Sequence, residues 1–203
     1  MDYFTLFATA AAAGLLQLDN VQFLQSMVSR PLAASLLFGL ICGCPGEAAR
    51  LGLLTELIYS DYMPMGGSLP PNGVTASAVG VLGVSSGVMS PGLAFFAGLA
   101  AGYLYSGAEF RLRTIRSGWN GAVEEALSAG RPALGRRLAA SLAMESAAVF
   151  VYVSVLAGAI AAAGAAGADL LFLAPPAELA YAFMPWLGLS ALYFRFRTQT
   201  LKK

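Results

Sequence analysis

Residues 74–108 read VTASAVGVLGVSSGVMSPGLAFFAGLAAGYLYSGA and contain no charged side chain in 35 positions. At a rise of about 1.5 Å per residue, a single helix of this length would measure roughly 50 Å. The hydrocarbon core of a bilayer is about 30 Å thick. The stretch therefore predicts one or more transmembrane segments over 74–108. It either breaks near Ser90-Pro91-Gly92 or projects well beyond the bilayer.

The composition of the whole chain agrees with this stretch. Of 203 residues, 58% are hydrophobic and only 11% are charged, and the formal net charge is +1. A soluble domain usually has about a quarter charged residues, and a nucleic-acid-binding domain needs a basic surface. These values exclude a water-soluble enzyme, a disordered tail and a nucleic-acid binder. The sequence therefore predicts an integral membrane protein with no nucleic-acid partner.

Two further apolar runs predict a transmembrane hairpin over 138–194. The first run, Leu138–Gly164, is interrupted only by Glu145, and the second run, Leu170–Phe194, contains prolines that are expected to kink it. Only five residues separate the two runs. We therefore expect a tight connection and two antiparallel helices.

Basic residues set the predicted orientation. Ten of the twelve lysines and arginines lie in two stretches, 109–137 and 195–203, and the hairpin places both on one side. Because loops rich in lysine and arginine stay in the cytoplasm, we expect 109–137 to be a cytoplasmic basic loop and 195–203 a cytoplasmic basic tail. Within the loop, Trp119–Ala129 alternates apolar and acidic residues. This pattern predicts a short amphipathic helix on the membrane surface or against a partner.

The first 73 residues differ from the rest of the chain. Their apolar runs are short, and polar residues and prolines separate them. Short hydrophobic segments broken by glycine or proline are typical of re-entrant transporter helices. Non-helical backbone is tolerated at membrane depth only where protein or a water-filled cavity surrounds it. The predicted fold is therefore an all-α, polytopic membrane protein with a broken or re-entrant region over 1–73 that builds a polar site. The alternative is three ordinary short helices with charged loops in water.

The chain offers little of the chemistry that catalysis or metal binding needs. It contains no histidine, so no imidazole is available as a base, a phosphate carrier or a metal ligand. Its two cysteines, Cys42 and Cys44, are too few for a soft metal site and are spaced poorly for an internal disulfide. We expect no catalytic residue, no metal and no cofactor in this chain.

Glu56 is the sharpest candidate for a binding residue because it lies in the apolar stretch 51–58. Charged groups in hydrocarbon are costly and tend to pair or to face a cavity. A carboxylate only accepts hydrogen bonds, and sugar hydroxyls donate them. The alternative is a structural ion pair with Arg30 or Arg50. Asp19 follows a run of apolar residues and is a second candidate, with helix capping as its alternative role.

Other features near the predicted spans are candidates for weaker reasons. The loop 63–73 contains three prolines and three glycines, so its backbone can approach a ligand closely. Ordinary turn chemistry explains the same composition. Glu145 and Glu178 lie in or near spans, and we expect them to link helices rather than to contact a substrate.

One part of the chain resembles a known family. The pattern fits residues 30–72 without a gap and rests beyond residue 73 on hydropathy and overall order. The residues that carry it are Leu18-Asp19, Gln25, Ser29-Arg30-Pro31-Leu32, Gly39, Gly43, Thr55-Glu56-Leu57-Ile58, Met63-Pro64-Met65-Gly66 and Pro71-Asn72. With them the chain resembles the sugar-channel subunit, component IIC, of the mannose/fructose/sorbose-type phosphoenolpyruvate-dependent phosphotransferase system.

The resemblance implies a function and a set of partners. Component IIC pairs with a second membrane subunit, component IID, and works with the cytoplasmic components IIB and IIA in an oligomeric complex of the bacterial inner membrane, surrounded by membrane lipid. A hexose-class sugar crosses the membrane and receives a phosphoryl group from a phosphohistidine on IIB. The donor chain starts at phosphoenolpyruvate. A IIC subunit carries no phosphoryl group itself, which agrees with the missing histidine.

The same resemblance implies where the sugar binds. It places the substrate-binding residues at Asp19, Gln25, Glu56 and Asn72, and we expect the first three to hydrogen-bond to sugar hydroxyls. Asn72 stands where many members of the family have aspartate, and because an amide both donates and accepts, a change in selectivity is expected there. Gln22 competes with Gln25 for its role, because the spacing at this point varies in the family.

The end of the sequence leads to an alternative function. Members of the family usually continue with further membrane segments beyond the region that matches Phe183-Met184-Pro185, whereas this sequence ends in a basic tail. The alternative is a shortened, non-transporting IIC-like membrane protein with a regulatory or partner-binding role. A third interpretation, a transporter of unrelated solutes, requires the match over 30–72 to be accidental.

Overall fold

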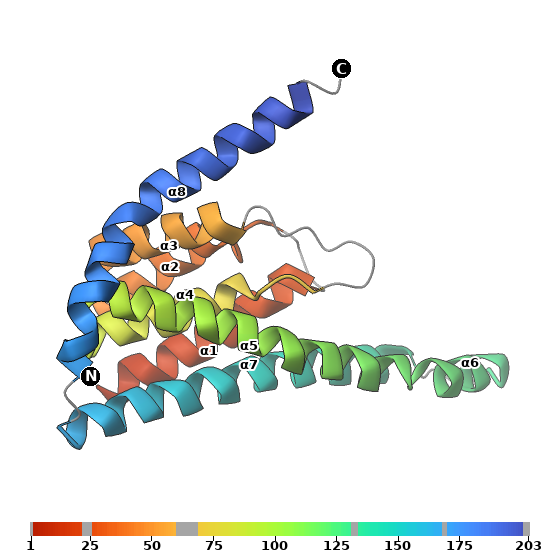
Figure 1. The fold of residues 1–203 in the computed structure, drawn as a ribbon. Helices are drawn as coiled ribbons and strands as arrows, with labels where there is room; N and C mark the ends of the chain where they lie inside the picture. The colour runs from red at the N-terminus through yellow and green to blue at the C-terminus, as the bar shows by residue number, and fades with distance from the viewer. Residues whose placement is uncertain (1, 22–25, 60–68, 131–133, 168–169, 201–203) are drawn as a thin grey trace.

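The computed structural model describes residues 2–21, 26–59, 69–130, 134–167 and 170–200, and every regular element in them is a helix (Figure 1). The prediction of an all-α fold is confirmed. In chain order the elements are α1 (Tyr3–Val21), α2 (Pro31–Cys42), α3 (Pro45–Tyr59), α4 (Gly73–Ser85), α5 (Pro91–Ser117), α6 (Asn120–Ser128), α7 (Leu134–Ala165), the 3-10 helix η1 (Leu170–Leu173) and α8 (Ala174–Thr200).

The uncharged stretch 74–108 breaks into two helices. Gly87 has a left-handed φ of 69°, and the hydroxyl of Ser90 accepts a hydrogen bond from the Leu93 N–H at 3.3 Å, which caps α5. Pro91 then occupies the first turn of α5, where its missing N–H costs nothing. Of the two alternatives for this stretch, the break is the one observed.

α4 lies at the centre of the fold, and α5 packs closely along it. Every residue of α4 from Val74 to Gly83 is buried. A Cβ atom on Gly98 of α5 would lie 2.5 Å from the carbonyl oxygen of Ala76, so this position tolerates no side chain. Gly98 and Gly102 are four residues apart, and small residues at this spacing let two membrane helices approach closely. The contact fixes the start of α4 against α5.

The N-terminal region consists of α1 and a short helical hairpin made by α2 and α3. Gly43 has a φ of 74° and ends α2, and Pro45 starts α3. α2 contains 12 residues and so measures about 18 Å, well under the roughly 30 Å of a hydrocarbon core. A helix of this length does not cross a bilayer alone. This agrees with the re-entrant interpretation of 1–73, which stays a prediction.

α5 extends beyond the boundary expected at residue 108 and ends at Ser117. The ion pair between Glu109 and Arg113, four residues apart at 2.7 Å, stabilises this extension. α6 follows within the segment 119–129, where a short helix was expected, and none of its residues is buried. Figure 1 shows that the C-terminal half of α5, α6 and the N-terminal half of α7 form an arm that projects from the helical body.

α7 and α8 diverge from their connection instead of packing as the hairpin expected over 138–194 (Figure 1). α7 packs on α1, whereas α8 packs on α5 and α3. A Cβ atom on Gly92 would lie 2.7 Å from the carbonyl oxygen of Ala177, so α8 approaches α5 closely there. The Glu178 carboxylate also accepts a hydrogen bond from the Gly92 N–H at 2.6 Å. These contacts hold α8 on α5. Figure 1 shows that α8 changes direction along its length, and Pro185 lies inside this helix.

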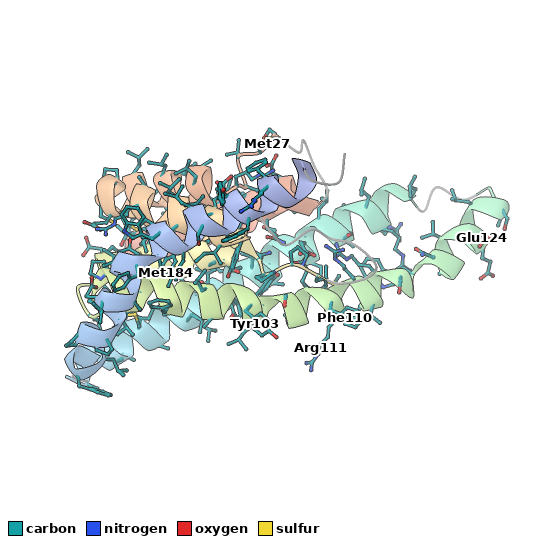
Figure 2. All side chains as sticks on the ribbon, turned by 45° about the horizontal axis from the view of Figure 1, so that its top comes forward. Met27, Tyr103, Phe110, Arg111, Glu124 and Met184 are labelled. Carbon is teal, nitrogen blue, oxygen red and sulfur yellow. The ribbon has the colours of Figure 1, made fainter. Side chains whose placement is uncertain are left out.

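The outside of the molecule is strongly apolar. Among the described residues, α7 is long and apolar enough to cross a membrane. Tyr103 and Phe110 project from the outer side of α5 and are mostly exposed (Figure 2). Large apolar side chains gathered on a surface mark contact with lipid or with another protein.

Candidate functional site

The connection between α1 and α2 is held by the carboxylate of Asp19. Its Oδ1 accepts hydrogen bonds from the N–H and the hydroxyl of Ser26, both at 2.7 Å, and its Oδ2 accepts one from the Ser29 N–H at 3.1 Å. Between these two contacts, Met27 has a φ of 64°, which is uncommon for a residue with a side chain. Asp19 therefore fixes a strained turn directly before α2.

Glu56 on α3 caps the N-terminus of α2 from outside that helix. Its Oε2 accepts a hydrogen bond from the Leu32 N–H at 3.1 Å, and its Oε1 lies 3.7 Å from a guanidinium nitrogen of Arg30. Arg30 is the N-cap residue of α2, and its side chain makes no capping hydrogen bond. The Glu56 carboxylate replaces that cap and interacts favourably with the positive end of the helix.

Asp19 and Glu56 therefore act on the same short segment, residues 26–32. The ion pair with Arg30, the alternative interpretation of Glu56, is present in the structure. At 3.7 Å it is longer than a charge-assisted hydrogen bond of about 2.7–2.9 Å. The Glu56 side chain is 30% exposed, so part of it can be reached from outside the protein. The arrangement joins two acceptor groups and one donor group, a combination suited to several hydroxyls at once.

Asn72 lies apart from this segment, buried at the start of α4. Its Oδ1 accepts a hydrogen bond from the Thr75 N–H at 2.9 Å, which makes it the N-cap of α4. Its Nδ2 donates to Gln17 at 2.8 Å and to Glu109 at 3.3 Å. Because the residue is only 2% exposed, a sugar could contact its amide only after a rearrangement. The sugar-binding role of Asn72 stays a prediction.

The remaining expectations about the site concern residues that the structure does not describe. Gln25, its competitor Gln22 and most of the loop 63–73 lie outside the described ranges. Among the residues that are described, no three acidic or cysteine side chains come together in a way that could hold a metal ion. The expected lack of a metal, a cofactor and a catalytic residue stays a prediction.

A second group of polar side chains joins α1, α4, α5 and α7. Arg116 lies 3.0 Å from Glu145, Arg113 lies 2.7 Å from Glu109, and Gln17 donates to Glu145 at 3.2 Å. Two carboxylates balance two guanidinium groups, so their charges cancel. We call this group the buried charge cluster. Its members are Gln17, Asn72, Glu109, Arg116 and Glu145, together with Arg113 at its exposed edge.

Sequence reasoning selected Asn72 and Glu145, placed Arg113 and Arg116 only in the basic loop 109–137, and missed Gln17 and Glu109 altogether. Gln17 is an isolated polar residue in the apolar run 3–18, and Glu109 directly follows the uncharged stretch 74–108. The rule that polar groups inside a membrane are paired or functional, which selected Glu56, would have selected both. Their partners could not be found in this way, because Gln17 and Glu145 are 128 positions apart.

Two glutamates link helices, as predicted. Glu145 connects α7 to α5 through Arg116 and to α1 through Gln17. Glu178 connects α8 to the first turn of α5 through the Gly92 N–H. A carboxylate at the positive end of a helix is favourable, so Glu178 also stabilises the start of α5.

Replacing Asn72 with alanine is expected to destabilise the protein more than the loss of an ordinary helix cap does. The variant loses the α4 cap, worth about 1 kcal/mol. It also removes a hydrogen bond from the buried oxygens of Gln17 and Glu109, at about 1–3 kcal/mol for each unsatisfied group. Ser90→Ala is the matched control, because it removes the α5 cap outside the cluster. In detergent, the midpoint of thermal unfolding should fall further for Asn72→Ala than for Ser90→Ala. Equal falls would contradict a role of Asn72 in the cluster.

Comparisons with known proteins agree with this architecture. The family model for the PTS system sorbose-specific IIC component matches residues 3–185. No curated protein matches the sequence at a significant level.

Two solved structures share the fold. One, described as a membrane protein, has a TM-score of 0.76 and 20% sequence identity, and the alignment covers 97% of this chain and 81% of that chain. The other is a cryo-EM structure of the mannose transporter ManYZ in complex with microcin E492 (MceA), with a TM-score of 0.67, 22% identity and the same coverage. At these identities the likeness concerns the fold alone.

Proposed function

This chain belongs to the family of sorbose-specific IIC components of the phosphotransferase system, and we propose that it binds a hexose-class sugar and moves it inward for phosphorylation by a partner IIB component. Membership in the family makes it a membrane-embedded channel subunit of a sugar phosphotransferase complex. The class of sugar, the phosphorylation by IIB and the site residues are what the proposal adds.

One observation carries the proposed site. The carboxylates of Asp19 and Glu56 hold the segment 26–32 from two sides, with the guanidinium group of Arg30 close to Glu56. Sugar hydroxyls can donate to the carboxylates and accept from the guanidinium group. The left-handed backbone of Met27 lies in the same segment, and strained backbone is concentrated at binding sites. We propose Asp19 and Glu56 as sugar contacts, with Gln25 and Asn72 as further candidates from the resemblance.

The proposed partners follow from the phosphoryl transfer. The chain has no histidine, so we propose that the phosphoryl group passes directly from a phosphohistidine of IIB to a sugar hydroxyl. The P–N bond breaks, a P–O bond to the sugar forms, and the hydroxyl proton goes to the freed imidazole. The proposed complex also contains the membrane subunit IID and the cytoplasmic component IIA, and lies in the inner membrane of a bacterium.

The arrangement of the helices supports the proposed orientation. In Figure 1, α7 runs from the α6 end toward its connection with α8, and α8 runs back away from that connection toward its C-terminal end. The basic segments 109–137 and 195–203 would therefore share one face, and the positive-inside rule places such a face in the cytoplasm. This is the compartment in which IIB must meet the bound sugar. We propose 1–73 as the sugar-site region, and 74–108 and 138–194 as the membrane-spanning regions.

Phosphoenolpyruvate-dependent phosphorylation of a labelled panel of hexoses and hexosamines tests the proposal. Membranes that contain this chain with IID are supplied with IIB, IIA and the donor proteins. We expect one or a few sugars to be phosphorylated, and the reaction to stop when IIB is left out. No phosphorylation of any sugar by an assembled complex would overturn the proposal and favour the non-transporting, partner-binding alternative.

A further inference from the structure

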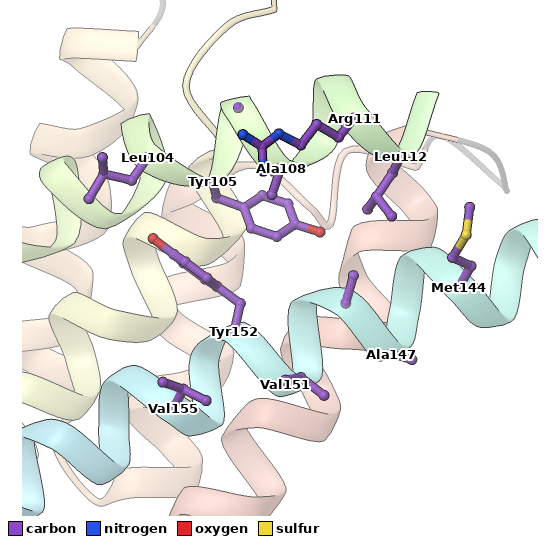
Figure 3. A pocket seen from close by; sticks show the side chains of 12 residues that line it. Leu104, Tyr105, Ala108, Arg111, Leu112, Met144, Ala147, Val151, Tyr152 and Val155 are labelled. Carbon is purple, nitrogen blue, oxygen red and sulfur yellow. The ribbon is translucent and has the colours of Figure 1, made fainter. Parts of the chain in front are cut away.

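A groove runs along the outside of the molecule between α5 and α7 (Figure 3). Its volume is about 890 Å³. It opens outward, since Val151, which points into it from α7, is 56% exposed. Tyr105 and Tyr152 pack against each other in its lining, with ring centroids 5.1 Å apart. We call it the α5–α7 groove, and the aliphatic residues that the argument uses are Leu104, Ala108, Leu112, Met144, Val151 and Val155.

The length of the α5–α7 groove is close to the thickness of one leaflet of a bilayer. Along α5 it extends from Leu104 to Leu112, and along α7 from Met144 to Val155. At about 1.5 Å per residue these lengths are roughly 12–16 Å, about half of the roughly 30 Å hydrocarbon core. A partner's transmembrane helix would cross both leaflets, whereas an acyl chain occupies one. The length of the groove therefore favours an acyl chain.

One cation at the edge of the groove lacks an acidic partner. Of the arginines near the end of α5, Arg113 pairs with Glu109 and Arg116 pairs with Glu145, whereas Arg111 makes no ion pair within the described part of the chain. Figure 3 shows the guanidinium group of Arg111 at the edge of the groove. A basic side chain beside an apolar groove attracts an anionic lipid headgroup.

From this geometry we propose that the α5–α7 groove binds an anionic phospholipid, with an acyl chain against the apolar walls and the phosphate group against Arg111. The groove is apolar along its length and carries its free cation near the end where α5 becomes charged, which is the arrangement of a lipid with its headgroup at the membrane surface. The lipid would brace the arm formed by α5, α6 and α7. This inference rests on the membrane fold and is independent of the sugar site.

The test measures lipid binding to the full chain, delipidated in detergent, by native mass spectrometry. The probes are palmitoyl-oleoyl phosphatidylglycerol and the phosphatidylethanolamine with the same acyl chains. We expect Arg111→Gln to weaken phosphatidylglycerol binding about fivefold and to weaken phosphatidylethanolamine binding less, because the ammonium group of that lipid offsets the charge of its phosphate. Arg136→Gln is the matched control, because it removes the same charge from an exposed position outside the groove. Its phosphatidylglycerol affinity should stay at the wild-type value.

A second variant tests the groove itself. Val151→Trp fills the groove from an exposed position, so it should weaken the binding of both lipids without unfolding the protein. Equal losses for Arg111→Gln and Arg136→Gln would overturn the proposal, because they would indicate diffuse attraction by a basic surface. Val151→Trp that retains lipid binding but loses assembly with a membrane partner, or with a second copy, would overturn it in favour of a protein interface.

Discussion

Replacing Glu145 with alanine is expected to lower the free energy of unfolding by about 3–5 kcal/mol, the usual cost of leaving one partner of a buried ion pair without the other. The Glu145 side chain is 0% exposed and that of Arg116, 3.0 Å away, is 13% exposed. The variant leaves this guanidinium group without its counter-charge and the Gln17 amide without its acceptor. For a chain of this size the midpoint of thermal unfolding in detergent should fall by roughly 6–20 °C.

Two further variants test whether the loss of stability comes from the broken ion pair or from substitution in general. Glu124→Ala is the matched control, because it removes a carboxylate from the exposed helix α6 and should change the midpoint little. The double variant Glu145→Leu with Arg116→Leu removes both charges, and apolar replacements of a buried pair are often neutral. It should be clearly more stable than Glu145→Ala. A double variant less stable than Glu145→Ala would show that the unpaired guanidinium group of Arg116 is not the source of the loss.

The buried charge cluster also shows how far the fold could be predicted from the sequence. The uncharged stretch 74–108 indicated membrane segments and left two alternatives open, a break near Ser90 or a projection beyond the bilayer, and the structure shows the break. Local composition decides such features, because a proline and its capping residue act on their own turn. The divergence of α7 and α8 could not be predicted from a five-residue connection. It depends on the contact of Gly92 with Ala177, whose partners lie 85 positions apart in the sequence.

The candidate site could also be predicted only in part from the sequence. Glu56 was selected from the sequence because it interrupts an apolar run, and the structure brings it to the same segment as Asp19. Asn72 was selected by resemblance, but its amide is occupied by Gln17 and Glu109. Which polar residues share a cavity depends on how helices pack, and packing among small residues is nearly the same for many registers. The sequence can therefore identify costly polar groups, but it cannot pair them.

Replacing Glu56 with glutamine is expected to lower kcat/KM for sugar phosphorylation by about 10- to 150-fold while the fold is retained. The amide oxygen can still accept the hydrogen bond from the Leu32 N–H, so α2 keeps its cap. What is lost is the negative charge that would accept from a sugar hydroxyl, and hydrogen bonds to charged groups are worth about 1.5–3 kcal/mol. Glu56→Ala removes both functions and should abolish uptake while the protein still inserts. Phosphorylation assays with IIB, together with thermal unfolding, measure the two effects separately.

The design distinguishes a sugar contact from the capping of α2, while the ion pair with Arg30, which Glu56→Gln also removes, is exposed enough to contribute little to stability. If Glu56 only caps α2, a complex that contains Glu56→Gln should phosphorylate sugar at the wild-type rate. Glu56→Ala should then lose stability and activity together. If it binds sugar, Glu56→Gln should lose activity with an unfolding midpoint close to that of the wild type. Glu47→Gln is the matched control, because Glu47 is an exposed carboxylate in the first turn of the same helix. A normal rate for Glu56→Gln would remove Glu56 from the proposed site and leave Asp19 as its remaining described carboxylate.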